Sequence, residues 1–487
     1  MQLTDLIGAT AHALEIAGPD IVGLASDSRA VKPGFLFAAL AGVKTDGARF
    51  IDDAVRNGAA AVLAAPDAEL AQRLAAANVA FVADAEPRAR LAAIAATFFG
   101  RQPATVAAVT GTNGKTSVAT FTRQIWTQLG FAAGSLGTLG VQAPGFEVVL
   151  AHTTPDPITL HRLLAELAGR GVDHLAMEAS SHGLDQHRLD AVQVRAAAFT
   201  NLTRDHLDYH PSVETYFAAK MRLFDAVMPP GGTAVVNADS DWYGAVAELA
   251  QARGHRLISY GARGADLRIE SLAPHAHGLH LDLTLFGARH AIDLPLVGTF
   301  QAGNALCALG LVIACGADAG KAVAALSHLS GVPGRMQAVA TTAAGAPIFV
   351  DYAHTPDALE TVLRALRPHA SGRLVVVFGC GGDRDRGKRP LMGRLAAELA
   401  DVAYVTDDNP RTEDATGIRA AIMAACPGGI EIGDRAAAID TAVTGLQAGD
   451  VLVIAGKGHE QGQIVGNVVR PFDDATVARA AATRRVH

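Results

Sequence analysis

The sequence has few of the features that mark secreted, membrane or disulfide-rich proteins. Only four of its 487 residues are cysteines, and their positions fit neither zinc-ligand nor disulfide spacing: Cys307, Cys315, Cys380 and Cys426. No lysine or arginine precedes Arg29, so the basic region of a signal peptide is missing. The longest apolar stretch, residues 306–317, is too short to span a bilayer. We therefore expect a cytoplasmic protein with no membrane insertion.

Charge is also scarce. Charged residues make up 18% of the chain, the net charge is −7, and both signs are interspersed, which argues against a nucleic-acid-binding surface. Half of the residues are hydrophobic, so the chain can bury a large core and is not expected to be disordered. The length predicts about three domains.

Short strands and helices alternate along the chain, which predicts an α/β fold. Pro103 introduces the segment that leads into the most distinctive motif, and a Pro/Gly-rich hinge follows at residues 331–335. These breaks predict domains at residues 1–99, 100–331 and 332–487. Within the second domain, residues 268–300 have the alternation typical of antiparallel strands.

The most distinctive stretch is VAAVTGTNGKTS, residues 106–117. It predicts a strand, a glycine loop and a helix, an arrangement whose backbone N–H groups cradle phosphate oxygens. Lys115 is expected to contact the β- and γ-phosphates, and Thr116 to bind magnesium. The general P-loop has a glycine where this chain has Val109, so this is a narrower form of the motif. The alternative is an ordinary glycine turn.

Three other residues of the second domain are candidates for a functional role only because the glycine loop precedes them in the same domain. Glu178 ends an apolar strand, where an acid can hold a phosphate-bound metal. His206 lies in a polar cluster after the next strand, and Lys220 lies on the following helix. Taken alone, His206 is more typical of a structural histidine and Lys220 of a solvated surface lysine. The run HAHGLH (residues 275–280) suggests a metal, but alternation along an exposed strand explains it better.

The flanking domains carry weaker signals. The loop Ser26 to Arg29 has hydroxyl and basic groups suited to sugar or diphosphate oxygens, although taken alone it is more typical of ordinary turn chemistry. In the last domain each strand ends in a polar or glycine-rich loop. Such loops meet in one crevice at the carboxyl edge of a parallel sheet.

Eight motifs occur in order: TGTNGKTS, MEASSHGLDQHR, FTNLTRDHLDYH, AAK, DYAHTPD, GCGGDRDRGKRP, DDNPR and GKGHE. Together they resemble the Mur ligases of peptidoglycan synthesis, over nearly the whole chain. The resemblance implies an α/β protein of three domains: an N-terminal domain for a UDP-sugar, a central P-loop mononucleotide-binding ATPase domain and a C-terminal Rossmann-like domain.

The resemblance also implies a reaction. ATP and Mg²⁺ activate the glutamate carboxylate of UDP-N-acetylmuramoyl-L-alanyl-D-glutamate as an acyl phosphate, and meso-2,6-diaminopimelate then attacks it. An anionic carboxylate must approach a polyanion, and two unit charges ~4 Å apart repel by ~4 kcal/mol at an effective dielectric of ~20. Cations must offset this repulsion.

By the same resemblance, four residues are expected to be catalytic: Lys115, Glu178, His206 and Lys220. The expected metal ligands are Thr116, Glu178, His206 and Lys220, the last as a carbamate, an anionic oxygen ligand that suits magnesium. The expected ATP-binding residues are Gly111, Thr112, Asn113, Gly114, Lys115, Thr116, Ser117, Asn304, Arg335, Asp351 and His354.

Two further groups follow from the resemblance. The expected ligands of the UDP-muramoyl-dipeptide are Ser26, Ser28, Val43, Lys44, Thr45, His152, Thr153, Thr154, Ser180, Gln186 and Arg188. The expected ligands of diaminopimelate are Arg389, Asp408, Asn409, Pro410, Arg411, Gly456 and Glu460. Arg411 is the specificity candidate, because a guanidinium binds a distal carboxylate bidentately and lysine has none. Without the family context, Asp408 to Arg411 is also compatible with a proline-fixed turn.

Alternatives remain at this stage. The same chemistry is compatible with lysine as the added amino acid, or with a folylpolyglutamate synthase-like ligase. A nucleotide-dependent switch or scaffold that hydrolyses ATP is a rival of another class. We expect a monomer whose partners are small-molecule substrates only.

Overall fold

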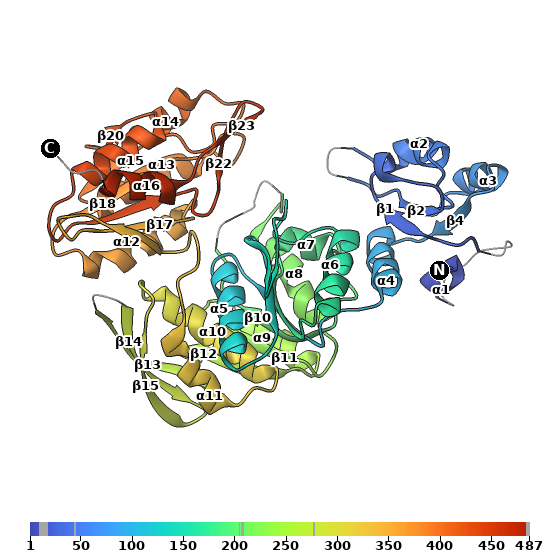
Figure 1. Ribbon diagram of the computed structural model, residues 1–487, viewed down its shortest axis with the longest axis horizontal. Coiled ribbons are helices and arrows are strands. Elements are labelled where there is room, and N and C mark those ends of the chain that lie inside the picture. Colours follow the sequence, from blue (N-terminus) through green and yellow to red (C-terminus); the bar gives the residue numbers. More distant parts are fainter. Residues whose placement is uncertain (9–17, 43–44, 204, 206–208, 276–277, 484–487) are drawn as a thin grey trace.

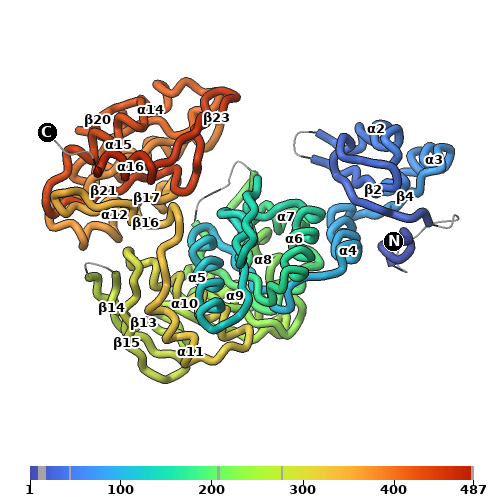
Figure 2. Tube along the Cα trace, viewed as in Figure 1, coloured from blue at the N-terminus to red at the C-terminus, as the bar shows by residue number. Residues whose placement is uncertain are grey.

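The computed structural model describes residues 1–8, 18–42, 45–203, 205, 209–275 and 278–483. It has three α/β domains, each built on its own sheet, and the predicted fold class is confirmed (Figure 1). The N-terminal and C-terminal domains lie apart, each attached to the central domain (Figure 2). No described helix combines the length and the apolar character that a bilayer crossing requires. The boundaries at residues 99/100 and 331/332 stay predictions.

The N-terminal domain is a parallel four-stranded sheet in the order β1-β2-β3-β4. Its strands are β1 (Gly23–Ala25), β2 (Phe35–Ala38), β3 (Ala61–Ala64) and β4 (Ala80–Ala83). Its helices are α1 (Leu3–Ile7), α2 (Ile51–Arg56), α3 (Ala68–Ala76) and α4 (Pro87–Phe99). Helix α4 leads into the central domain and packs against α6 (Pro157–Gly169).

The central domain has an eleven-stranded sheet in the order β15-β14-β13-β12-β11-β10-β5-β9-β6-β7-β8. Its strands are β5 (Thr105–Thr110), β6 (Ala133–Gly137), β7 (Gly140–Ala143), β8 (Phe146–Val148), β9 (His174–Glu178), β10 (Val194–Phe199), β11 (Thr233–Asn237), β12 (Arg256–Gly261), β13 (Leu267–His275), β14 (Gly278–Leu285) and β15 (Ala288–Leu294). Its other helices are α5 (Lys115–Gln128), α7 (Ser181–Asp185), α8 (Val213–Arg222), α9 (Tyr243–Ala252), α10 (Phe300–Ala314) and α11 (Ala319–Ala324).

Strand β5 lies between β10 and β9 and is buried along its whole length. Its alternate residues enter two cores: Val109 packs with α5 and α10, and Val106 packs with α6. A strand covered on both faces reads as a continuous apolar run, as VAAV does. The antiparallel pairing of β13, β14 and β15 confirms the alternation predicted for residues 268–300.

The C-terminal domain has a six-stranded sheet in the order β16-β17-β21-β18-β19-β20, in which only β16 is antiparallel. The strands are β16 (Gln337–Thr341), β17 (Pro347–Asp351), β18 (Leu374–Phe378), β19 (Val402–Val405), β20 (Ile430–Glu431) and β21 (Val451–Ala455), with a separate hairpin of β22 (Gly462–Val465) and β23 (Val468–Pro471). The helices are α12 (Pro356–Leu366), α13 (Lys388–Leu399), α14 (Ala415–Met423), α15 (Arg435–Thr444) and α16 (Asp474–Thr483). The loops after β17, β18, β19 and β21 therefore share one edge of this sheet.

Candidate active site

The glycine loop follows β5 and opens α5, as the sequence predicts. Gly111 has φ +147°, and a Cβ there would lie 1.9 Å from the Thr200 hydroxyl oxygen, so no larger residue fits. The backbone N–H of Asn113 donates to the Asn201 side chain (2.9 Å), which fixes the loop against the end of β10. The loop residues from Thr112 to Ser117 line a cavity of about 580 Å³.

Two lysines converge on the start of this loop. Lys115 Nζ donates to the carbonyl oxygens of Gly111 (2.9 Å) and Thr112 (2.8 Å), and Lys220 Nζ donates to the Gly111 carbonyl (2.8 Å). Lys220 is 1% exposed and lies over the Tyr216 ring. Burial, together with the nearby charge of Lys115, lowers the pKa of Lys220 well below its usual value. Burial also lowers the pKa of Lys115. Lys220 is therefore not the solvated surface lysine of the alternative interpretation.

Thr116 and Glu178 form the oxygen-rich part of this cavity. The Thr116 hydroxyl donates to Glu178 Oε2 (3.1 Å), while Glu178 Oε1 accepts from the backbone N–H of Thr138 (2.7 Å). Glu178 is 1% exposed at the end of β9. A buried carboxylate beside a hydroxyl fits a hard cation such as Mg²⁺. No cluster of three or more His, Cys, Asp or Glu side chains suited to a metal occurs within the described ranges. His206 lies outside them.

The hinge brings residues of the C-terminal domain to the same cavity. Arg335 Nη2 lies 3.2 Å from the Thr116 hydroxyl, and its guanidinium stacks over the Tyr352 ring at 4.6 Å. Asp351, at the end of β17, accepts from the Met336 N–H (2.6 Å), and burial raises its pKa to about 6. All of the predicted ATP-binding residues except Gly111 line this cavity; Gly111 forms the base of the loop.

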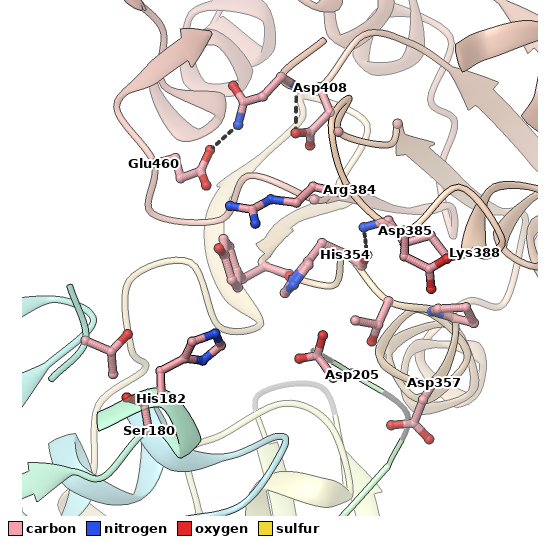
Figure 3. A pocket seen from close by; sticks show the side chains of 18 of the residues that line it. Ser180, His182, Asp205, His354, Asp357, Arg384, Asp385, Lys388, Asp408 and Glu460 are labelled. Carbon is pink, nitrogen blue, oxygen red and sulfur yellow. Dashed lines mark hydrogen bonds between the residues drawn. The ribbon is translucent and has the colours of Figure 1, made fainter. Parts of the chain in front are cut away.

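A second cavity of about 590 Å³ lies between the central and C-terminal domains. The loops after β18, β19 and β21 line it with Gly381, Arg411 and Glu460, among others. The two cavities adjoin, because both are lined by Thr153, Ser180, Asp205, Tyr352, His354 and Asp357. Figure 3 shows Asp205 near His354 and Asp357, three of the residues that line both cavities. Carboxylate, imidazole and hydroxyl groups thus connect the two chambers.

The loop after β19 is held in an unusual conformation. Arg411 has φ +52°, a left-handed value that is strained for a residue with a side chain. Its backbone N–H donates to Ile464 O (3.1 Å), and its carbonyl accepts from Gly466 N–H (2.7 Å). Its Nη1 donates to Gly382 O (2.9 Å), which aims the guanidinium along the cavity wall. The β22–β23 hairpin therefore fixes the residue that the sequence marks for specificity.

Not every predicted diaminopimelate ligand lines this cavity. Asp408, Asn409, Arg411, Gly456 and Glu460 do, whereas Arg389 and Pro410 are not among the lining residues. Arg389 is 5% exposed and pairs with Glu413 at 3.0 Å. Asp408 accepts from the Asn409 N–H through Oδ1, while its buried Oδ2 has no protein partner. An orphaned carboxylate oxygen in a cavity wall suits an ammonium group.

The predicted dipeptide ligands fall into two groups. Thr154, Ser180 and Arg188 form a bonded cluster, in which Arg188 Nη1 donates to Thr154 O (2.7 Å) and the Ser180 hydroxyl to that of Thr154 (3.1 Å). This cluster, with His152 and Thr153, lines the second cavity, and Gln186 supports it by accepting from Arg188 (2.7 Å). Ser26, Ser28 and Thr45 belong to the N-terminal domain and line neither cavity. Val43 and Lys44 lie outside the described residues.

Sequence reasoning missed several residues of these walls. His182, Arg384 and Lys388 line the second cavity, and Lys388 Nζ donates to His354 O (2.7 Å). Buried Lys457 lies behind the wall and pairs with Glu460. All four belong to motifs that the sequence displays, so the signal was present. The sequence does not show which way each of these side chains points, and this decides whether the residue lines a cavity.

Comparison with known proteins agrees with this geometry. Three family descriptions match successive parts of the chain: "Mur ligase family, catalytic domain" at residues 20–99, "Mur ligase middle domain" at 109–312 and "Mur ligase, glutamate ligase domain" at 334–458. The chain is 52% identical, over 100% of both lengths, to the UDP-N-acetylmuramoyl-L-alanyl-D-glutamate–2,6-diaminopimelate ligase of Mesorhizobium japonicum.

Solved structures give the same result. One titled as a UDP-N-acetylmuramoyl-L-alanyl-D-glutamate–2,6-diaminopimelate ligase matches with a TM-score of 0.72 and 34% identity, covering 99% of this chain and 98% of that one. The folylpolyglutamate synthase of Mycobacterium tuberculosis, solved with ADP and AMPPCP, matches at 19% identity with a TM-score of 0.64, over 82% of this chain and 96% of that one, which shows a shared fold. This chain belongs to the Mur ligase family.

Proposed function

We propose that this chain is an ATP-dependent ligase that adds meso-2,6-diaminopimelate to UDP-N-acetylmuramoyl-L-alanyl-D-glutamate through an acyl phosphate. The observation that carries the proposal is the pair of adjoining cavities, one lined by the nucleotide loop and the other by the loop with Arg411. Shared walls allow the activated carboxylate and the attacking amine to meet. The full-length relatives carry the name of this reaction.

The first step joins the glutamate carboxylate to the γ-phosphorus. A carboxylate oxygen forms the new P–O bond, the bond to the β-phosphate oxygen breaks, and ADP leaves. Lys115 and Arg335 supply positive charge at the loop, which offsets the repulsion between the two anions. Thr116 and Glu178, with His206, would hold Mg²⁺, which when bound supplies charge neutralisation for the phosphates.

The second step uses the amine of the incoming amino acid. Its nitrogen attacks the acyl carbon, a proton leaves the nitrogen, and inorganic phosphate departs with one oxygen of the original carboxylate. Asp408 and Glu460 attract ammonium, and Arg411 pairs with the distal carboxylate. Thr153, Ser180 and Arg188 orient the dipeptide end of the UDP substrate. The loops of the N-terminal domain with Ser26 and Ser28 hold its UDP end.

Lys220 serves this site as a carbamate. A neutral amine adds carbon dioxide by forming an N–C bond and releasing a proton, which converts a basic side chain into an oxygen ligand. Its buried position supports this assignment: its Nζ shares the Gly111 carbonyl with Lys115, and it lines the same cavity as Glu178.

Replacement by alanine tests the carbamate. We expect Lys220→Ala to lose about 10²-fold or more of the ligation rate, with partial recovery in added bicarbonate or a short carboxylate. Lys321→Ala, on an exposed lysine of α11, is the control. Full activity of Lys220→Ala would contradict the assignment.

A substrate-dependence assay tests the proposed function. Phosphate release from ATP is measured with each substrate omitted in turn, and with diaminopimelate isomers, lysine, ornithine and glutamate as the amino acid. We expect release to require both the UDP-muramoyl-dipeptide and diaminopimelate. Preference for lysine would favour the lysine-adding alternative, and preference for glutamate would favour a folylpolyglutamate synthase-like ligase. Release that ignores both substrates would favour a nucleotide switch. The enzyme works as a cytoplasmic monomer without nucleic-acid partners.

A further inference from the structure

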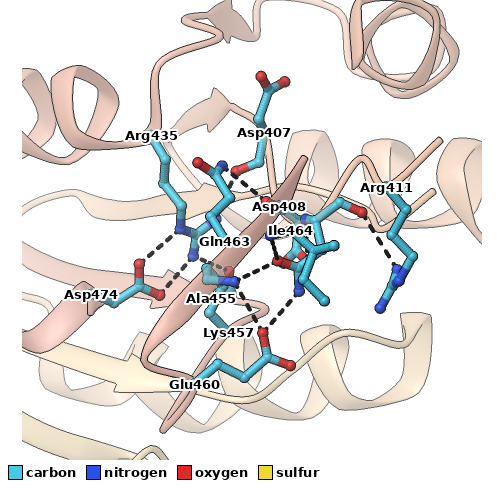
Figure 4. A network of polar contacts seen from close by, with 11 residues as sticks. Asp407, Asp408, Arg411, Arg435, Ala455, Lys457, Glu460, Gln463, Ile464 and Asp474 are labelled. Carbon is cyan, nitrogen blue, oxygen red and sulfur yellow. Dashed lines mark hydrogen bonds and ion pairs between the residues drawn. The ribbon is translucent and has the colours of Figure 1, made fainter. Parts of the chain in front are cut away.

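A fully buried lysine lies directly behind the part of the second cavity lined by Asn409, Arg411 and Glu460, which we call the amino-acid wall. Lys457 follows β21 and its side chain is 0% exposed. Its Nζ donates to Asn409 Oδ1 at 2.9 Å and pairs with Glu460 Oε2 at 3.0 Å (Figure 4). Burying an ammonium group is costly unless partners compensate it. Lys457 is therefore tied to these two residues.

The ammonium group determines how the Asn409 amide is turned. Asn409 Oδ1 accepts from both Lys457 Nζ and the Ile464 N–H (2.9 Å), so the oxygen must face these two donors. The amide nitrogen then faces the other way and donates to Glu460 Oε2 at 2.9 Å. With Lys457 replaced by an apolar side chain, one of the two donors that fix the amide is lost.

The same contacts orient Glu460. Its Oε2 accepts from both Lys457 and Asn409, so this oxygen is committed to the interior. The Glu460 side chain is 31% exposed and lines the cavity with Asn409, whereas Lys457 is not among the lining residues. Lys457 can therefore affect a bound ligand only indirectly, by fixing the orientation of Asn409 and Glu460.

A second buried cation of the same domain offers a contrast. Arg435 pairs with Asp474 through two hydrogen bonds of 2.7 Å, and both side chains are 0% exposed. Neither lines the cavity. Arg435 joins the start of α15 to α16 and also donates to Ala455 O (2.9 Å) at the end of β21, so its bonds hold separate elements of the domain together.

We propose that Lys457 is a positioning residue for amino-acid recognition: through its bonds to Asn409 and Glu460 it turns Glu460 so that the second carboxylate oxygen of Glu460 meets the ammonium of the incoming amino acid. The inference deepens the proposed function and rests on it. It concerns the affinity for the amino acid and leaves the nucleotide loop of the central domain unaffected.

The test compares substitutions of Lys457 and of Arg435 in the full-length enzyme. For Lys457→Met we expect the KM for diaminopimelate to rise about tenfold or more, with the KM values for ATP and the UDP-muramoyl-dipeptide within twofold of wild type. Combining Lys457→Met with Glu460→Gln should raise the diaminopimelate KM by much less than the product of the single effects. Arg435→Met should lower the melting temperature without separating the three KM values.

Parallel changes in all three KM values, an unchanged diaminopimelate KM, or additive effects in the double variant would overturn the inference. Lys457→Gln keeps an N–H donor without the charge and serves if Lys457→Met does not fold; the same KM separation is expected. Failure of both variants to fold would make Lys457 structural and also overturn it. The wild-type assay separates the two proposals, since lack of diaminopimelate-dependent phosphate release contradicts the function itself.

Discussion

The nucleotide loop and the amino-acid wall handle positive charge in opposite ways. At the nucleotide loop, Lys115 and Lys220 both donate to the Gly111 carbonyl. Behind the wall of the second cavity the basic side chains pair with carboxylates, as in Lys457 with Glu460 and Arg389 with Glu413. The loop thus keeps the charge of Lys115 for a polyanion, whereas the charges of Lys457 and Arg389 are neutralised by neighbouring carboxylates. The amino-acid wall then presents a few oriented polar groups to the incoming amino acid, which is a small zwitterion.

This difference predicts where a single substitution acts. Removing a basic group from the loop should affect catalysis, because its charge acts on the ligand. Removing one from a paired site should affect stability or orientation, because its charge acts on a neighbouring side chain. Four substitutions sharpen this comparison, from the largest expected effect to the smallest.

The largest effect is expected at the loop. Lys115→Ala should lower the ligation rate by about 10³-fold or more, as expected when a preorganised positive group is lost from a site of developing negative charge. The melting temperature should stay the same or rise, because a partly buried cation beside a second lysine disappears. Phosphate release and thermal unfolding measure the two quantities, with Lys321→Ala as the surface control. A destabilised but active Lys115→Ala would reverse the comparison.

The buried pair of the C-terminal domain should show the opposite pattern. Asp474→Asn leaves Arg435 without its anionic partner at 0% exposure, and we expect it to lower the free energy of unfolding by about 3 kcal/mol. Urea unfolding of this variant is compared with that of Asp241→Asn, at an exposed carboxylate. Below the unfolding transition its KM values should match wild type. A change in stability no larger than that of Asp241→Asn would contradict the structural assignment.

The third substitution concerns Arg411, a cavity-lining residue whose charge is expected to act on the incoming amino acid. Arg411→Ala should raise the KM for diaminopimelate by about 30-fold, or about 2 kcal/mol, because a charged bidentate pair is lost. The KM for ATP should be unchanged. Arg394→Ala, on the exposed side of α13, is the matched control. Equal effects on both substrates would exclude distal-carboxylate recognition.

The smallest effect concerns stability against pH. Burial tends to raise the pKa of Asp450, but hydrogen bonds from Arg373 and from the backbone outweigh it and lower the pKa to about 2. A depressed carboxyl pKa stabilises the fold above the ordinary value of 3.8 and loses this contribution as the pH falls toward 2. Asp450→Asn should therefore lower stability by about 1–2 kcal/mol at pH 7, allowing for solvent around Arg373.

The pH series for Asp450→Asn is recorded by urea unfolding from pH 7 downwards. The difference from wild type should shrink between pH 4 and pH 2, where Asp450 itself becomes protonated. A difference that stays constant over this range would show that the carboxylate charge contributes little.

The two regions also differ in how far the sequence predicts them. The nucleotide loop is continuous in sequence, so strand, glycine loop and helix are visible as local patterns, and Gly111 follows from backbone geometry alone. The wall is assembled from loops after β18, β19 and β21. Only the fold brings Arg411 beside Gly382, or shows that Arg389 turns away to Glu413.

Lys457 shows most clearly what the sequence alone does not predict. The sequence shows a lysine between two glycines, which alone indicates little. Its meaning depends on a contact with Asn409, 48 residues earlier, and on complete burial, and neither leaves a periodic pattern in the chain. Site prediction therefore succeeds where the chemistry lies within one turn of chain, and fails where it depends on the packing of separate loops.

The central claim is that the adjoining cavities let a carboxylate attack the γ-phosphate before the amine arrives. The most direct test uses UDP-N-acetylmuramoyl-L-alanyl-D-glutamate with ¹⁸O in the glutamate side-chain carboxylate, together with ATP, Mg²⁺ and diaminopimelate. We expect one ¹⁸O atom in the inorganic phosphate for every amide bond formed. Phosphate without ¹⁸O, formed at the same rate as the amide, would contradict it.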